Sequence, residues 1–124
     1  MYVPADLRYS VDQEWVRLVS GNCARIGITD YAQDALGEVV FVEAPQMGAR
    51  VEAGSVFGEV ESAKSVSELF APVTGEVVAV NEALESAPEK VNDDPYGEGW
   101  ICEVSIEFEG ELMDAAAYQT LIED

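Results

Sequence analysis

A short pattern occurs twice in this chain and limits the folds it can adopt. Residues 37–42 read GEVVFV, and residues 75–80 read GEVVAV. Each copy is followed by a loop that contains proline and then by a second run of β-forming residues, at 57–60 in the first half and at 100–104 in the second. Similar strand pairs in series predict two halves related by approximate two-fold symmetry.

Two alternating segments precede the first copy. Residues 14–20 and 23–28 alternate in polarity on either side of a turn, which predicts a β-hairpin whose half-buried first strand has Val16 and Leu18 on one face. Residues 29–37 then predict a short helix that packs on a sheet, because it is too short to be stable alone. We expect Asp30 to cap this helix and Gly37 to take the left-handed conformation after its last turn.

The second half ends in a long loop and a helix. Residues 81–99 are rich in turn residues, with a helical turn predicted at 82–85. Residues 113–122 predict a closing helix, capped by Asp114, that packs across one end of the sheets. The sequence therefore predicts a mainly β single domain of two antiparallel sheets with short helices and a C-terminal helix at about 114–122. The large aromatic residues are expected in the core; they are Trp15, Phe41, Phe57 and Trp100.

Charge and composition exclude several classes of function. The 124 residues include 25 acidic and 6 basic side chains, a net charge of −19, so we expect neither a nucleic-acid nor a membrane partner. Histidine, the commonest general base and metal ligand, is absent. Residues 1–6 lack the basic and apolar regions of a secretory signal, which favours a cytoplasmic location, although a processed organellar protein would share this feature. Cys23 and Cys102 are expected to be reduced and packed.

Lys64 lies between two strand-like runs, in the segment GEVESAKSVSEL at residues 58–69. The small side chains of Ser62, Ala63 and Ser65 flank it closely and leave the amine accessible. A lysine in a turn is usually only solvated, and Lys90, in the long loop, is interpreted in that way. The position of Lys64 between the two similar halves instead favours an attachment point that other enzymes can reach.

The chain from about Tyr9 to Ile122 resembles the H proteins of the glycine cleavage system. The matching segments are EWV at 14–16, IGITDYAQ at 26–33, LGEVVFV at 36–42, GEVESAKS at 58–65, PVTGEV at 72–77 and VNDDPYGEGW at 91–100. The first and the last two of these are not shared with generic lipoyl domains. The resemblance implies a lipoyl/biotinyl-type barrel-sandwich hybrid, with the lipoyl-like core at about 24–106 within a single carrier domain at 1–124.

The resemblance also implies what the chain does. Lys64 would carry (R)-lipoate as an amide, attached by a lipoate ligase or a lipoyl/octanoyl transferase. The carrier would catalyse nothing itself. It would take the aminomethyl group of glycine from the P protein, a glycine decarboxylase, to the T protein, an aminomethyltransferase, and the L protein, a dihydrolipoyl dehydrogenase, would reoxidise the arm.

Glu14 matches a family position that lines a cleft for the loaded arm, although a glutamate on a strand is more often solvated. Gln13 stands where the family usually has His, and its amide offers one donor and one acceptor at similar reach.

The sequence leaves three other functions open. A biotin carrier would share the fold, but that family favours Met on both sides of its lysine, where this chain has Ala63 and Ser65. A lipoate donor, relaying the group to other lipoyl-dependent enzymes, would need the same modified lysine. An unmodified interaction domain would need no attachment at all. The intact mass of the protein from its own cells separates the biotin carrier and the interaction domain from a lipoyl carrier.

Overall fold

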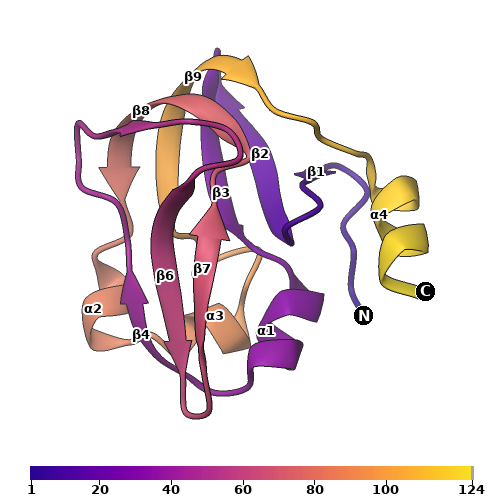
Figure 1. Ribbon diagram of the computed structural model, residues 1–124, viewed down its shortest axis with the longest axis vertical. Helices are drawn as coiled ribbons and strands as arrows, with labels where there is room; N and C mark the ends of the chain where they lie inside the picture. The colour runs from indigo at the N-terminus through magenta and orange to yellow at the C-terminus, as the bar shows by residue number, and fades with distance from the viewer. Residues whose placement is uncertain (124) are drawn as a thin grey trace.

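The strands of the computed structural model, which describes residues 1–123, form two antiparallel sheets (Figure 1). The larger sheet has the order β1-β2-β3-β9-β8-β5 and the smaller one the order β4-β6-β7. The strands are β1 Arg8–Tyr9, β2 Glu14–Ser20, β3 Cys23–Ile28, β4 Val39–Glu43, β5 Arg50–Val51, β6 Val56–Ser62, β7 Val66–Phe70, β8 Val73–Val80 and β9 Cys102–Glu109. The helices are α1 Asp30–Leu36, α2 Ala83–Ser86, α3 Lys90–Asp93 and α4 Ala115–Glu123. No helix within residues 1–123 is long and apolar enough to cross a membrane.

The repeated pattern forms equivalent strand pairs, as predicted. The first copy contributes β4, which pairs with β6, and the second contributes β8, which pairs with β9. The two copies lie in different sheets, and the third residue of each, Val39 and Val77, is buried. The fourth residues, Val40 and Val78, are exposed. The repeat therefore places one apolar row from each sheet in a shared core.

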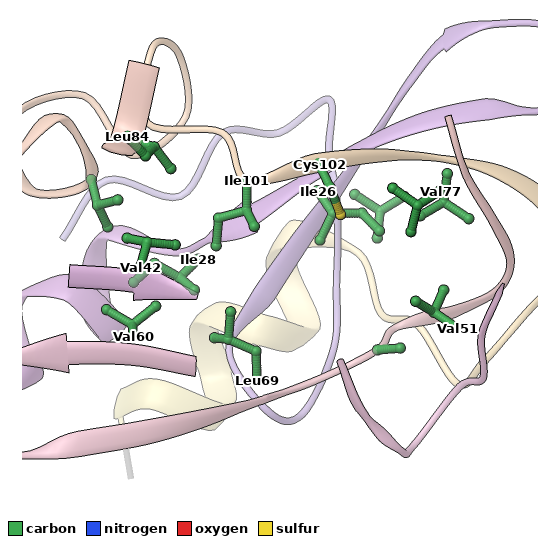
Figure 2. Packing of buried hydrophobic residues seen from close by; sticks show 14 of the residues in the cluster. Ile26, Ile28, Val42, Val51, Val60, Leu69, Val77, Leu84, Ile101 and Cys102 are labelled. Carbon is green, nitrogen blue, oxygen red and sulfur yellow. The ribbon is translucent and has the colours of Figure 1, made fainter. Parts of the chain in front are cut away.

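Apolar side chains from both sheets meet in this core (Figure 2). Val60 and Leu69 from the smaller sheet pack in the same cluster as Ile26 and Cys102 from the larger one. Burying each large aliphatic side chain contributes about 1.5–3 kcal/mol, so this layer holds the two sheets together. Both cysteines are free, and Cys102 is fully buried.

A second cluster joins the N-terminal segment to α4. The rings of Tyr9 and Tyr118 stack with centroids 4.7 Å apart, and Tyr9 and Met113 exchange two backbone hydrogen bonds. Asp114 caps α4 as predicted, because its Oδ1 accepts a hydrogen bond of 2.9 Å from the backbone N–H of Ala117. The C-terminal helix packs on β1 through this aromatic contact.

Several local predictions were wrong. Phe41, expected in the core, is 53% exposed on the smaller sheet. Leu18 shares a strand face with the buried Val16 but is 61% exposed, because only the first three residues of β2 are buried. The N-cap of α1 is Thr29 rather than Asp30, because the extended backbone at Thr29 directs its hydroxyl to the N–H of Ala32. The helical turn predicted at 82–85 corresponds to α2, but α3 was not anticipated.

Gly27 supplies a test of the packing. A Cβ at Gly27 would lie 2.6 Å from the indole Cζ2 of Trp15, which is fully buried and donates a hydrogen bond from Nε1 to the carbonyl of Pro95. Because the ring cannot move away, we expect Gly27→Ala to lower the free energy of unfolding by about 1–3 kcal/mol. Denaturant unfolding of Gly27→Ala, of Trp15→Phe and of the double variant measures the energetic coupling between the two positions. We expect the double variant to be more stable than the sum of the single effects predicts, whereas additive effects would exclude this clash.

Candidate functional site

Lys64 lies at the tip of the β6–β7 hairpin, which extends beyond the helices at one end of the molecule (Figure 1). The turn is closed by Ser62, whose backbone N–H donates to the carbonyl of Ser65 at 2.7 Å. The buried Oγ of Ser62 also accepts hydrogen bonds from the backbone N–H groups of Lys64, at 3.3 Å, and Ser65, at 3.1 Å. One serine thereby organises the turn locally and leaves the lysine side chain exposed.

The turn rests on the connection between α1 and β4. The backbone N–H of Ala63 donates to the carbonyl of Glu38 at 3.0 Å. A Cβ at Gly37 would lie 3.0 Å from Cε of Lys64, so the lysine stem runs across a glycine that leaves room for it. Gly37 also has a φ of +84°, as predicted, which other residues adopt only with strain. The glycine that opens the repeat thus has a second role beneath the lysine, which the sequence pattern did not reveal.

The two lysines of the chain differ in their electrostatic surroundings. Lys90, which was expected to be only solvated, lies in α3, is partly buried, and pairs with Glu98 at 3.5 Å. The Nζ atom of Lys64 makes no ion pair within residues 1–123. Of the two lysines, Lys64 is therefore the one with an exposed amine that makes no ion pair within the described part of the chain.

A cleft of about 210 Å³ opens between α1, β7 and the loop at residues 12–13. Its lining combines apolar side chains with a polar rim, and the residues are Asp12, Gln13, Ile28, Tyr31, Ala32, Ala35, Leu36, Ser67, Glu68 and Leu69. Three of these residues belong to β7, the strand that begins just after Lys64. The larger hollow of about 690 Å³ lies between residues 43 and 59 and includes no residue of the lysine turn. The smaller cleft is therefore the concave site nearest to Lys64 along the hairpin.

Glu14 is buried, not solvated as its position on a strand first suggested. Its side chain is 1% exposed, and its carboxylate accepts hydrogen bonds from the hydroxyl of Ser10 at 2.6 Å and from the N–H of Phe70 at 3.3 Å. Burial away from water raises the pKa of Glu14 from 4.5 to about 8, because the charged form loses its hydration. Phe70 ends β7, so Glu14 and Lys64 lie at opposite ends of this strand, roughly 20 Å apart along it. Glu14 does not line the cleft, and its contact with a loaded arm stays a prediction.

Gln13, next to Glu14, links the cleft to the C-terminal helix. It has a φ of +78°, the only positive value among the non-glycine residues within 1–123. Its Oε1 accepts a hydrogen bond from the hydroxyl of Tyr118, and its backbone carbonyl accepts one of 3.0 Å from the N–H of Thr29. The hydroxyls of Tyr118 and Thr29 also lie 2.7 Å apart. Tyr118 thus supports a cleft residue, although the sequence indicated only that it packs.

Replacing Glu14 by Gln tests whether its carboxyl is protonated. Between pH 4.5 and about 8 the unfolded chain releases this proton while the folded chain retains it, so the wild type loses stability as the pH rises. The neutral variant escapes this loss. We expect Glu14→Gln to match the wild type near pH 4.5 and to exceed it near pH 8 by on the order of a few kcal/mol. Denaturant unfolding of both proteins at the two pH values measures this difference, and a difference that does not change with pH would show that Glu14 titrates normally.

Comparison with known proteins places the chain in a family. The sequence profile described as "Glycine cleavage H-protein" matches residues 7–124. The glycine cleavage system H protein of Corynebacterium jeikeium is 58% identical over 120 residues, 94% of each chain. That of Beutenbergia cavernae is 56% identical over 121 residues, which are 98% of this chain and 97% of the relative.

A solved structure agrees with the fold described above. The crystal structure of a glycine cleavage system H protein from Mycobacterium marinum superposes with a TM-score of 0.93 at 41% identity, covering 98% of this chain and 100% of that one. The expected fold class is thereby confirmed. These relatives are matched over nearly their whole length, and the chain belongs to the glycine cleavage H-protein family, the non-catalytic lipoyl carriers of glycine catabolism.

Proposed function

We propose that Lys64 is the residue to which the lipoyl group is attached, and that residues 1–124 form one carrier domain with its lipoyl-like core at about 24–106. The observation that supports this most strongly is the exposed Lys64 amine, without an ion pair within residues 1–123, on a hairpin tip in one of the segments that resemble the H proteins. Lys90, the other lysine, is half-buried and paired with Glu98.

The residues around Lys64 fit an attached lipoyl group. Amide formation needs an accessible amine, and Ala63 and Ser65 on either side are small and exposed. Gly37 leaves space for the lysine stem at its base. When bound, the lipoyl group supplies a disulfide whose sulfur can take up a one-carbon amine and whose reduction stores two electrons. This chain contributes the attachment point and a rigid hairpin that holds it away from the body of the protein.

The chain is a component of the glycine cleavage system, and we propose that its partners are the P, T and L proteins together with a lipoate ligase or a lipoyl/octanoyl transferase. The net charge of −19 favours association with basic surfaces on such partners. Tethering on one lysine raises the effective concentration of the lipoyl group at each active site that the carrier visits. The same lysine would serve a lipoate relay, and no feature of residues 1–123 favours that role. The cytoplasmic location stays a prediction of the sequence.

The cleft beside β7 is the site we propose for the end of the arm. Its apolar lining suits the hydrocarbon chain, and Asp12 and Glu68 on its rim suit a cationic amine. Glu14 does not line this cleft but is bonded to Phe70, next to the lining residue Leu69. We propose that Glu14 binds the amine once the loop at residues 12–13 shifts. A buried carboxyl near a cation favours its charged form.

This role of Glu14 predicts a change in its pKa. We expect the value of about 8 in the unmodified protein to fall when an amine-bearing group is attached at Lys64, because the ammonium stabilises the carboxylate. NMR titration of the side-chain carboxyl carbon in the two forms measures the shift. An unchanged pKa would remove Glu14 from the arm site.

Substituting Lys64 by Arg tests the attachment directly. Arginine keeps the positive charge but cannot form the amide, and the exposed position places no demand on packing. We expect an unchanged free energy of unfolding, no lipoyl mass increment, and complete loss of glycine cleavage in a system reconstituted with the P, T and L proteins. Lys90→Arg is the matched control and should retain activity. Activity in the Lys64→Arg protein would contradict the assignment.

A further inference from the structure

Asn92, in the short helix α3, joins two elements through one side-chain amide. Its Nδ2 donates hydrogen bonds to the carbonyl of Gly37 at 2.8 Å and to Oε1 of Gln33 at 2.9 Å. Its Oδ1 accepts a hydrogen bond of 2.8 Å from the backbone N–H of Val39. Asn92 therefore fixes the end of α1 to the start of β4, across more than fifty residues of sequence.

Asn92 makes hydrogen bonds on both sides of Glu38, the residue that supports the lysine turn. Glu38 lies between the two backbone groups that Asn92 holds, and its carbonyl is the acceptor for the N–H of Ala63. Gly37, whose carbonyl Asn92 holds, is also the residue over which the stem of Lys64 runs. The Gly37–Glu38 segment follows the last turn of α1 and precedes β4, so regular secondary structure does not fix it. The amide of Asn92 adds its hydrogen bonds to the two that backbone groups make there, from the Gly37 N–H to the Gln33 carbonyl and from the Ala63 N–H to the Glu38 carbonyl.

Asn81 gives a comparison within the same region. Its side chain also makes three hydrogen bonds, donating to the carbonyls of Glu98 and Trp100 and accepting from the N–H of Ala83. These partners all lie in the long loop or at its end, and none is a hydrogen-bond partner of the lysine turn within residues 1–123. Asn81 and Asn92 thus each make two donor and one acceptor hydrogen bonds through the side-chain amide. Of the two, Asn92 is the one that bonds to the backbone on either side of Glu38, which supports the lysine turn.

We propose that Asn92 is a positioning residue for Lys64, holding the Gly37–Glu38 segment so that the lysine turn is presented in one conformation to the enzymes that modify or visit it. The part that concerns those enzymes rests on the proposed function. A turn that is ordered before binding avoids the loss of conformational freedom that a mobile turn would suffer on docking. Loss of Asn92 should therefore weaken recognition of the carrier more than the chemical step on the lysine.

The first test uses the unmodified protein and needs no enzyme. Hydrogen exchange of the Ala63 amide, measured by NMR, reports on the bond to Glu38. We expect Asn92→Ala to accelerate this exchange by about tenfold, relative to the wild type, and Asn81→Ala to leave it unchanged. The Val60 amide, in the buried part of β6, should exchange at similar rates in both variants. Unchanged exchange at Ala63 in Asn92→Ala, or equal acceleration in the two variants, would overturn the proposal.

The second test measures lipoylation by a lipoate ligase supplied with free lipoate and ATP, which activates the carboxylate for amide formation. We expect the KM for the Asn92→Ala carrier to rise about fivefold or more with kcat within about twofold, while Asn81→Ala behaves as the wild type. A fall in kcat alone, or the same rise in KM for both variants, would overturn the positioning role.

If the wild type accepts no lipoate, the proposed function fails, and the exchange rate of the Ala63 amide still decides the role of Asn92. If Asn92→Ala does not fold, Gln33→Ala, which removes one partner of Asn92, should show a smaller acceleration at Ala63, and none would overturn the proposal.

Discussion

The apolar layer shared by two unequal sheets is the constraint on which the rest of this structure depends. Val60 and Leu69 from the three-stranded sheet pack in one cluster with Ile26 and Cys102 from the larger one, and this cluster anchors both strands of the β6–β7 hairpin. The hairpin extends past the core, so Lys64 at its tip is exposed while its base is rigid (Figure 1). The same burial that stabilises the fold therefore determines where the lysine is presented.

A series of hydrogen bonds holds the turn that carries Lys64. The Oγ of Ser62 closes the turn, the carbonyl of Glu38 anchors it, and Asn92 anchors the segment that contains Glu38. At the other end of β7 the buried Glu14 carboxyl binds the N–H of Phe70. Lys64 thus lies just before the start of β7, and a carboxyl of raised pKa lies at the end of this strand, with the cleft between them.

Much of this arrangement could be predicted from the sequence, because local patterns encode it. The repeat predicted the pairs β4–β6 and β8–β9, and the position of Lys64 between the two halves predicted its place on a hairpin turn. Contacts between distant segments could not be predicted. The burial of Glu14 depends on Ser10 and on the end of β7, and the reach of Asn92 to Gly37 depends on how the long loop folds back. The exposure of Leu18 likewise reflects how far the core extends along β2, which alternation alone does not specify.

The central claim is that Lys64 carries the lipoyl group and that the chemistry belongs to the proteins it visits. The most direct measurement is the intact mass of the protein purified from its own cells, followed by mapping of the modified peptide. The account predicts the mass increment of one lipoyl amide, located on the peptide that contains Lys64. A biotin increment, a lipoyl group on Lys90, or an unmodified chain in cells that supply lipoate would contradict it.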